Sequence, residues 1–399
     1  MEVKHIGIFG KRNVGKSSLV NTLLGENVAI VSPEAGTTTD PVKKRMEISG
    51  VGPVQLIDTA GLDDTGELGG LRVKKAKAVI SQIDLAFVLF AGNVFGKEER
   101  DICKQLHTYG VPVVLVHNQS DIIPLDPGTA FELTEKYGCD VVEFSCCILD
   151  EQEQKRAVEM LVSFIVKNIG NSEKSILHAL VQEGDTVALV CPVDKGAPTG
   201  RLILPQVMAI RDILDHQAVA VVLQPDRLEG YLKKSTPSLV VTDSQAFREV
   251  AALTPEAIPM TSFSVLLART KGNFKEYVSG AEAISGLKEG DKVLVLESCT
   301  HHKSCDDIGR VKIPGLLCKY IGKKPDALDF TFVSGLDEIP REEYALAIQC
   351  GGCMVTSRQL NNRINELIKR GIKVTNYGMA IAYMNGIFER AVAGAGWRR

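Results

Sequence analysis

The stretch HIGIFGKRNVGKSSLVNTLLG, from His5 to Gly25, constrains the fold more than any other part of the chain. An apolar strand pattern leads into a glycine-rich turn, and a helix begins near Lys16. The turn fits G-x-x-x-x-G-K-S, in which main-chain amides and a lysine surround phosphate groups. Because strand, turn and helix occur in the required order, the sequence predicts a phosphate-binding loop (P-loop) in an α/β domain.

The residue types in this turn have distinct expected roles. Gly10 and Gly15 let the backbone come close to phosphate, and Lys16 reaches the β and γ oxygens. Ser17 is expected to ligate Mg²⁺. The predicted phosphate-binding residues are Gly10, Asn13, Val14, Gly15, Lys16, Ser17 and Ser18.

Two further segments are expected to complete the magnesium and γ-phosphate site. LIDTAG places Asp58 at the end of a strand, and the amide of Gly61 can sense the γ-phosphate. EAGTTTD lies between the P-loop helix and the next strand, where a mobile switch segment belongs. Thr38 is the expected Mg²⁺ ligand, with Thr37 and Thr39 as alternatives.

Two segments near strand ends favour guanine as the base. VVLVHNQSD ends a β-branched run with Asn118 and Asp121, where a carboxylate can accept both donor hydrogens of a guanine edge. Adenine presents no such pair of donors. The usual motif has Lys where this chain has Gln119, which predicts weaker base affinity. In EFSCC, Ser145 and Cys146 are expected to place amides near the guanine oxygen.

GKRNVGKSS, EAGTTTD and DTAGLDD resemble the TrmE-Era-EngA group of GTPases. The resemblance implies GTP hydrolysis in which Lys16 and Thr38 take part. Leu62 stands where Ras-like enzymes carry the water-orienting glutamine, which implies slow intrinsic hydrolysis. Asn13 matches the asparagine that helps to hold K⁺ in potassium-activated members. Asp64 matches the acidic residue that positions water there, or else is a solvated loop carboxylate.

Length and charge limit the remaining possibilities. The chain has 399 residues, a net charge of −3 and no positive excess for a nucleic-acid backbone, so nucleic acid is an unlikely main partner. MEVKHIGIFG does not resemble a signal peptide, and no apolar run approaches the roughly 20 residues of a membrane span. We therefore expect a cytoplasmic protein without membrane association. In that reducing compartment its ten cysteines are not expected to form a disulfide framework, and the clustered ones are expected to be metal ligands or redox groups.

The middle of the chain alternates short β-branched strands with helical stretches. TVALVCPV, AVAVVL and SLVVTD are the strand candidates. This alternation predicts right-handed β-α-β units and a small parallel sheet, with dimerisation as its expected role. The fold class is therefore α/β: a P-loop GTPase domain at 1–170, a middle dimerisation domain at 171–265 and a third α/β domain at 266–399. Both smaller domains are expected to have mainly parallel sheets.

Cysteines follow two strand patterns in the last region. KVLVLESCTHHKSC places Cys299 just after one buried-type strand, and YALAIQCGGC places Cys350 and Cys353 just after another. In a parallel sheet both sets emerge at the carboxyl ends of strands, where the topology leaves a crevice. Gly351 and Gly352 let the backbone curl so that both sulfurs face one centre. We expect the three thiols to converge.

The spacing alone allows three kinds of site. Tetrahedral zinc takes a fourth ligand, which His301 or His302 would supply. An iron–sulfur cluster uses three thiolates and leaves one iron with a weak or exchangeable ligand. A dithiol couple at Cys350 and Cys353 needs no metal.

The combination of a TrmE-like GTPase domain, a middle α/β segment, C-x-H and C-x-x-C resembles the HydF family of [FeFe]-hydrogenase maturation GTPases over nearly the whole chain. The resemblance implies a [4Fe-4S] cluster on Cys299, Cys350 and Cys353. The family pattern has histidine where this chain has Gln349. The fourth ligand is therefore open: His301, His302, a carboxylate from elsewhere or solvent.

The resemblance also implies a role in the cell. HydF proteins are scaffolds or carriers that receive the di-iron precursor made with two radical-SAM maturases and deliver it to the apo-hydrogenase. GTP, Mg²⁺, K⁺ and the cluster are the implied cofactors, and a homodimer is the implied assembly. The rival hypothesis is an RNA- or ribosome-associated GTPase with a structural zinc domain. A nucleotide-controlled redox sensor is a third.

Overall fold

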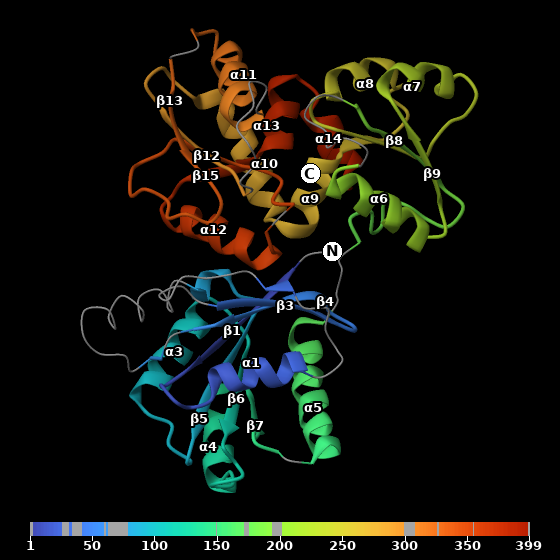
Figure 1. The fold of residues 1–399 in the computed structure, drawn as a ribbon. Coiled ribbons are helices and arrows are strands. Elements are labelled where there is room, and N and C mark those ends of the chain that lie inside the picture. Colours follow the sequence, from blue (N-terminus) through green and yellow to red (C-terminus); the bar gives the residue numbers. More distant parts are fainter. Residues whose placement is uncertain are drawn as a thin grey trace. The chain divides into compact units, whose positions relative to one another are not determined.

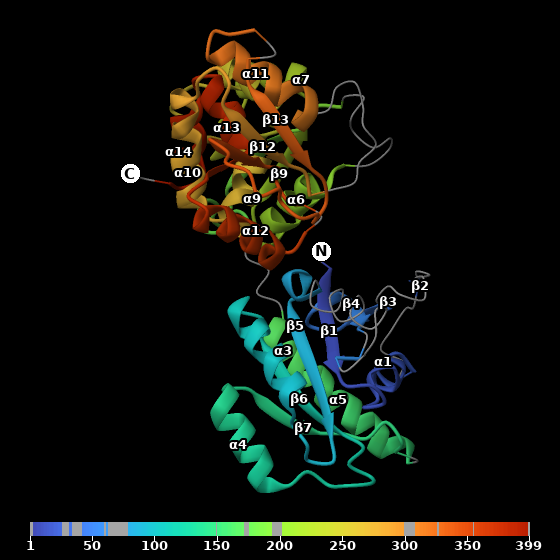
Figure 2. The ribbon, with the colours of Figure 1, turned by 90° about the vertical axis from the view of Figure 1, so that its left-hand side faces the viewer.

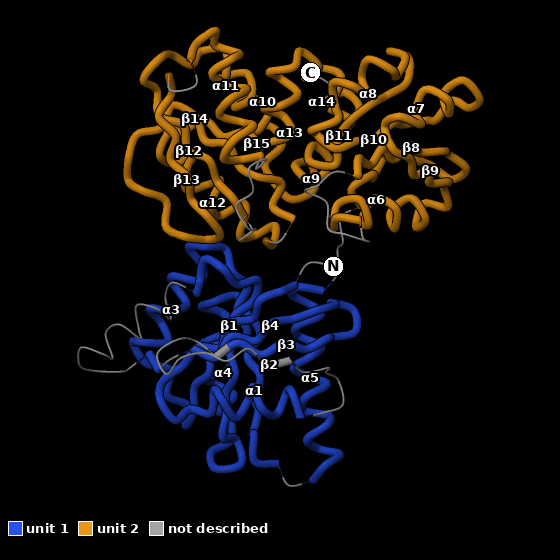
Figure 3. The backbone as a smooth tube through the Cα atoms, turned by 45° about the horizontal axis from the view of Figure 1, so that its top comes forward, with its two compact units in different colours: residues 1–172 blue, residues 173–399 orange. Residues whose placement is uncertain are grey.

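The structure is a computed structural model that describes residues 3–25, 32–33, 42–59, 61–62, 79–148, 150–170, 175–193, 202–298, 308–324, 327–353 and 355–397. The chain forms two compact units, residues 1–172 and residues 173–399 (Figure 3). Each unit has its own sheets and core, and each is described by itself below.

The first unit has a seven-stranded sheet of order β2-β3-β4-β1-β5-β6-β7 (Figure 1). Its strands are β1 (Lys4–Gly10), β2 (Ser32–Pro33), β3 (Val42–Ile48), β4 (Gly52–Asp58), β5 (Leu85–Ala91), β6 (Val113–Asn118) and β7 (Asp140–Glu143). The pairs β2–β3 and β3–β4 are antiparallel, and the pairs from β4 through β1 to β7 are parallel. The predicted P-loop α/β fold is confirmed.

Helices cover both faces of this sheet (Figure 2). On one face α1 (Lys16–Gly25) and α5 (Glu151–Ile169) share a core with β1 and β4. On the other face α3 (Lys97–Thr108), α4 (Pro127–Tyr137) and the short 3₁₀ helix η1 (Val79–Gln82) pack over β5 and β6. The central strands are buried on both faces, as parallel strands in α/β sheets are.

The second unit has two four-stranded parallel sheets. One has the order β11-β10-β8-β9, with β8 (Thr186–Val190), β9 (Val219–Leu223), β10 (Leu239–Thr242) and β11 (Met260–Ser262). The other has the order β13-β12-β14-β15, with β12 (Lys292–Leu296), β13 (Asp329–Val333), β14 (Leu346–Gln349) and β15 (Lys373–Asn376). The prediction of mainly parallel sheets is confirmed.

One apolar core runs through both sheets of this unit and contains side chains from Ile176 to Ala395. The helices of the first sheet are α6 (Leu204–Asp215), α7 (Pro225–Leu232), α8 (Phe247–Leu253) and α9 (Phe263–Lys271). The rest are α10 (Phe274–Glu282), η2 (Ala283–Gly286), η3 (Ile308–Lys312), α11 (Ile313–Tyr320), α12 (Ser357–Lys369), α13 (Tyr377–Met384) and α14 (Phe388–Gly394). Helix α9 contacts α6, α12 and α13, so it joins the two halves of the unit.

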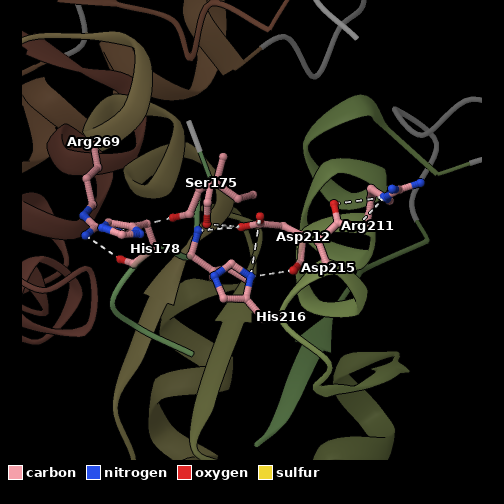
Figure 4. A network of polar contacts seen from close by, with 9 residues as sticks. Ser175, His178, Arg211, Asp212, Asp215, His216 and Arg269 are labelled. Atoms are coloured by element: carbon pink, nitrogen blue, oxygen red, sulfur yellow. Dashed lines mark hydrogen bonds and ion pairs between the residues drawn. The ribbon is translucent and has the colours of Figure 1, made fainter. Parts of the chain in front are cut away.

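A polar network fixes the start of this unit to α6 and α9 (Figure 4). Asp212 Oδ2 accepts hydrogen bonds from Ser175 Oγ at 2.9 Å and from the main-chain amide of Leu177 at 2.7 Å. Arg269 Nη2 donates to the main-chain oxygen of His178 at 2.7 Å. The segment at residues 175–178 is therefore held by two helices.

The two edge strands of the first sheet in this unit, β11 and β9, differ in what covers them. At one end α14 packs on β11: Thr261 Oγ1 donates to the main-chain oxygen of Ala391 at 2.9 Å. A Cβ atom on Gly394 would lie 2.1 Å from the main-chain oxygen of Met260. At the other edge, β8 is the one strand of the described residues that pairs with β9, which exposes Val219 and Val222.

Candidate functional site: a nucleotide site and a cysteine loop

The P-loop turn connects β1 to α1 in a conformation that requires glycine. Gly10 has φ +148° and Gly15 has φ +94°, values that side chains with a Cβ rarely adopt. A Cβ on Gly15 would also lie 2.1 Å from Asn118 Nδ2. The turn is therefore in direct contact with the strand that carries the predicted base-recognition residues.

The side chain of Lys16 folds over this turn and is nearly buried. Its Nζ donates to the main-chain oxygen of Lys11 at 2.6 Å and to that of Gly10 at 3.1 Å. A phosphate group in the turn would meet an ammonium group already held there.

Ser17 and Asp58 meet as the sequence analysis expected. Ser17 Oγ donates to Asp58 Oδ2 at 2.6 Å. Burial raises the pKa of Asp58, while the Ser17 bond and the charge of Lys16 lower it. Asp58 Oδ1 is buried and has no hydrogen-bond partner among the described residues. A hydroxyl beside a carboxylate with an unused oxygen fits Mg²⁺ and its water ligands.

Hydrogen bonds to main-chain oxygens of β1 hold the segment after Asp58. Thr59 donates from its Oγ1 to the main-chain oxygen of Ile8 at 2.6 Å. The amide of Leu62 donates to the main-chain oxygen of Gly10 at 3.2 Å, which brings Gly61 beside the turn. Thr38 and Asp64, with Thr37 and Thr39, lie outside the described residues.

Asn118 and Gln119 tie the end of β6 to the phosphate turn. Asn118 is 2% exposed, and its Nδ2 donates to the main-chain oxygen of Val14 at 2.8 Å. Gln119 Nε2 donates to the main-chain oxygen of Asn13 at 3.0 Å. Glutamine therefore makes a polar contact to the turn from the position where the usual motif has lysine.

Asp121 and Ser145 complete this end of the site. Ser145 Oγ donates to Asp121 Oδ1 at 2.5 Å and accepts from the amide of Cys147 at 3.0 Å. Cys146 Sγ lies 3.6 Å from Asn118 Oδ1. Burial raises the pKa of Cys146 to about 11, so its thiol stays neutral and can donate to the amide oxygen. The structure thus brings all four predicted base-site residues together.

His117, which the sequence pattern did not single out, directly precedes Asn118 in β6 and supports the loop at Asn93. It is fully buried, and its Nε2 accepts a hydrogen bond from the amide of Asn93 at 3.2 Å. Asn93 Oδ1 in turn accepts from the amide of Asp126 at 2.9 Å. Burial lowers the pKa of His117, which keeps the ring neutral. The available signal was a histidine inside a run of β-branched residues.

Cys350 lies at the carboxyl end of β14, beside the end of β12. Leu296 and Gln349 are partners in the parallel register of these strands. The amide of Ser298, just past β12, donates to Cys350 Sγ at 3.0 Å. Cys299, His301 and His302 lie outside the described residues. Two described features agree with the expected geometry: the strands are neighbours, and Cys350 and Cys353 are partly exposed.

Gln349 lies beneath the loop rather than at its surface. It is 0% exposed, and its Nε2 donates to Ser298 Oγ at 2.8 Å and lies 3.6 Å from Cys350 Sγ. Its Oε1 is buried with no hydrogen-bond partner among the described residues. The amide therefore orients groups around the sulfur.

Buried cations flank the same loop. Lys271 is 6% exposed, and its Nζ donates to the main-chain oxygens of Gly352 at 3.2 Å and Val355 at 3.0 Å. Burial lowers the pKa of Arg363, whereas nearby Cys350 raises it. No metal-binding group of three or more His, Cys, Asp or Glu side chains occurs among the described residues, which exclude Cys299. Amide donors and buried cations suit sulfur that carries negative charge.

Comparison with known proteins establishes the class of the first unit. Residues 5–119 match a family model described as 50S ribosome-binding GTPase. The chain is 44% identical over 117 residues to the tRNA modification GTPase MnmE of Thermoanaerobacter sp., covering 29% of this chain and 25% of that protein. It is 40% identical over 139 residues to MnmE of Nitrosomonas eutropha, covering 32% and 30%. The first unit is thus a GTPase domain, with GTP and Mg²⁺ as its ligands.

The second unit places the chain in a family. Residues 176–272 match the hydrogen maturase F dimerization domain, and residues 275–394 match the hydrogen maturase F tetramerization domain. Together these regions make up more than half of the chain, which belongs to the hydrogen maturase F (HydF) family of hydrogenase maturation GTPases. The names of both domains indicate an oligomer.

The other comparisons concern parts of the chain. The chain spans about a quarter to a third of the length of these curated relatives. Among solved structures, it is similar to Era in complex with MgGDPNP and 16S ribosomal RNA nucleotides. That similarity has 20% identity and a TM-score of 0.35, covering 56% of this chain and 93% of Era. Within the described residues, no helix has the length and apolar character needed to cross a bilayer.

Proposed function

We propose that this chain is a GTP-hydrolysing, [4Fe-4S]-binding scaffold that helps to assemble the di-iron precursor of the [FeFe]-hydrogenase active site and delivers it. Its partners would be two radical-SAM maturases and the apo-hydrogenase. The observation that carries the proposal is the position of Cys350 at the end of β14, beside the strand that leads into Cys299. The second-unit matches to hydrogen maturase F support it.

In the nucleotide site, phosphate would lie in the turn from Gly10 to Ser18, with Lys16 against the β and γ oxygens. Ser17 and Thr38 would ligate Mg²⁺, and Asp58 would hold its water ligands. The contact of Ser17 Oγ with Asp58 Oδ2 at 2.6 Å supports this arrangement. Gly61 would sense the γ-phosphate through its amide.

Guanine would be held by Asn118, Asp121, Ser145 and Cys146. The hydrogen bond from Ser145 to Asp121 orients the carboxylate, which would then accept both donor hydrogens of the guanine edge. Hydrolysis would be slow because Leu62 carries no group that orients water. K⁺ held near Asn13 would stimulate it, and Asp64 would position the water.

In the cysteine site, Cys299, Cys350 and Cys353 would hold the [4Fe-4S] cluster. The cluster would supply an iron with an exchangeable coordination position. The fourth ligand would be His301, His302, a carboxylate or solvent. The amide of Ser298 and the side chain of Gln349 would donate to sulfur, which favours the anionic form that binds iron.

The assembly would include a homodimer formed along β9. This edge strand exposes Val219 at 53% and Val222 at 46%, and α6 beside it exposes Leu214 at 58%. An unpaired apolar edge suits pairing with a second copy of itself. The match of residues 176–272 to a dimerization domain supports this choice of partner.

The three regions 1–170, 171–265 and 266–399 would thus serve nucleotide hydrolysis, dimerisation and cluster binding. Rearrangement of the switch segments with the γ-phosphate would gate partner exchange. A cytoplasmic location suits a protein that uses GTP and reduced thiols. Equal affinity of a partner for the nucleotide-free, GDP and GTP-analogue forms would exclude the gating.

The decisive experiment is anaerobic reconstitution of the full chain with iron and sulfide. The reduced EPR spectrum and a zinc assay would be recorded for the wild type and for Cys299→Ala, Cys353→Ala and the control Cys147→Ala. A [4Fe-4S] signal is expected in the wild type and the control, and its loss in the other two. Stoichiometric zinc without a cluster signal would overturn the proposal in favour of a structural zinc domain.

A further inference from the structure

Helix α9 presents one face to the cysteine loop. Ser264 and Leu267 are three residues apart, so they lie on the same side of the helix. A Cβ on Gly351 would lie 3.6 Å from Leu267 Cδ1 and 3.7 Å from Ser264 Oγ. The loop between the two cysteines therefore lies so near α9 that one added methyl group would reach van der Waals contact with the helix.

Lys271 continues this face by one more turn and holds the far side of the loop. Its Nζ donates to the main-chain oxygens of Gly352 at 3.2 Å and Val355 at 3.0 Å. These residues stand on either side of Cys353 in the chain. The ammonium group thus fixes the backbone from which that thiol projects.

Hydrogen bonds from α12, from the end of β15 and to His178 hold α9 in place within the second unit. Asn361 Nδ2 on α12 donates to the main-chain oxygen of Lys271 at 2.6 Å. Asn376 Nδ2, at the end of β15, donates to the main-chain oxygen of Ser264 at 2.8 Å. Arg269 connects the opposite side of the helix to His178 (Figure 4). The helix therefore provides a fixed support for the loop.

The charge of Lys271 also affects the reduction potential of a group bound at Cys353. Its side chain is 6% exposed, and removing an ammonium group from water is unfavourable unless charge or dipoles compensate it. Two carbonyl groups do so in part. A metal–sulfur group on Cys353 carries negative charge and becomes more negative when it is reduced. A buried cation beside it favours the reduced form, since net charge is one determinant of the potential of such groups.

We propose that Lys271 is a positioning residue of the cysteine site, which holds the backbone around Cys353 and whose charge favours the reduced state of the group bound there. The proposal rests on the proposed function, because it concerns the potential of the cluster. It makes α9 part of the metal site, although α9 lies in the region that matches the dimerization domain. The cysteine site is then incomplete without that region.

The test compares two variants with a matched control. Lys271→Met removes both the charge and the donors, whereas Lys271→Gln removes the charge and keeps N–H donors for the two carbonyl groups. Lys275→Met, at an exposed lysine four residues further on, is the control. Each full-length protein would be reconstituted anaerobically and titrated by EPR for the midpoint potential. Cluster loss to a chelator would be timed separately.

In Lys271→Met we expect a more negative midpoint potential and cluster loss at least about tenfold faster, as for other residues that orient metal ligands. Lys271→Gln should share the shift in potential with slower loss than Lys271→Met, and the control should match the wild type. If Lys271→Met does not fold, as judged by circular dichroism, Lys271→Gln decides. Potentials and loss rates equal to those of the cluster-bearing wild type would overturn the proposal. A wild type without a cluster would show that the proposed function has failed.

Discussion

Asn118 Nδ2 lies so close to Gly15 that a Cβ at that glycine would be 2.1 Å away. The phosphate turn and the base-recognition strand are thus in contact through an atom that only glycine leaves room for. Gly15 also has φ +94°, which disfavours any side chain. The close packing of the phosphate turn on Asn118 therefore requires a residue without a Cβ at position 15.

Gly15→Ala should weaken GTP binding by at least about tenfold, which is about 1.4 kcal/mol. The added methyl group displaces Asn118 or the turn, and both lie in the site. Fluorescence titration with a labelled guanine nucleotide measures the effect. Gly25→Ala on α1, where a Cβ meets no atom of the described residues within 4 Å, is the control and should bind normally. Equal affinity in the two variants would contradict the described contact.

Asp58 should make magnesium-dependent binding sensitive to acid. Because burial raises the pKa of this carboxyl, it takes up a proton at a higher pH than an ordinary aspartate, and the protonated form no longer attracts the metal. The Mg²⁺ concentration that supports nucleotide binding should therefore rise as the pH falls through this raised pKa. Titration with Mg²⁺ at several pH values checks this.

Asp58→Asn removes the titrating group, so it should need at least about tenfold more Mg²⁺ at neutral pH, about 1.4 kcal/mol, and lose this pH dependence. The same substitution should not destabilise the nucleotide-free protein at pH 7. The pKa of Asp58 is higher in the folded state than in the unfolded chain. At pH 7 the carboxyl is ionised, and burying this charge lowers the free energy of unfolding. If Asp58→Asn keeps the wild-type pH dependence of the Mg²⁺ requirement, a group other than Asp58 causes that dependence.

His117 should make the stability of the GTPase unit fall in mild acid. Burial lowers its pKa in the folded state, whereas the unfolded chain has the ordinary value of about 6.5. Below that value the unfolded state binds more protons, so the free energy of unfolding decreases as pH falls. Urea denaturation at pH 7.5 and 5.5 should show a smaller decrease for His117→Gln, whose side-chain oxygen can still accept from Asn93. His107→Gln, at an exposed histidine, should behave like the wild type.

The cysteines of the GTPase unit should differ strongly in reactivity. Burial raises the pKa of Cys103 to about 12 and those of Cys139 and Cys146 to about 11. At pH 7.5 a thiol with a pKa of 11 is well under about 0.1% ionised, and the thiolate is the reactive form. Cys147 is exposed, so iodoacetamide should label it first, as read by peptide mass spectrometry. Labelling of Cys146 at the same rate would contradict its burial.

A charge on β9 should separate the proposed dimer. Val222→Lys places an ammonium group at the edge where a second copy would pair, and the dissociation constant should rise at least about tenfold, about 1.4 kcal/mol. Sedimentation velocity at several concentrations measures it. Phe131→Lys on α4 is the control, because Phe131 is an exposed apolar residue of the first unit, at 70% against 46% for Val222. Unchanged association of Val222→Lys would move the interface away from this strand.

The sequence predicted the elements of the nucleotide site because their order is fixed along the chain. A strand, a glycine turn and a helix at Lys16 are local features, and Asn118 follows a β-branched run that ends where β6 ends. The parallel sheets followed from the alternation of strands and helices. By contrast, the contact between Gln119 and Asn13 joins residues 106 positions apart and has no local pattern.

The contacts that hold the cysteine loop could not be predicted from the sequence, because they too join residues far apart in the chain. In the sequence, Lys271 is indistinguishable from an ordinary lysine at the end of a helix. Its buried hydrogen bond to Gly352 joins residues 81 positions apart, so no local pattern predicts it. Gln349 was recognised as a departure from the family pattern, but its bond to Ser298 Oγ depends on the pairing of β14 with β12. Such contacts follow from the packing of the second unit, which periodicity does not define.

The contact of α14 with β11 has a consequence for the time course of biosynthesis. Thr261 and Ala391, which it joins, are 130 positions apart, so most of the second unit must leave the ribosome before this sheet edge is covered. Until then the edge of the sheet at β11 lacks the helix that packs on it, and such an uncovered edge can pair with other chains. Nascent chains stalled before residue 388 should therefore be the ones that a holdase chaperone retains.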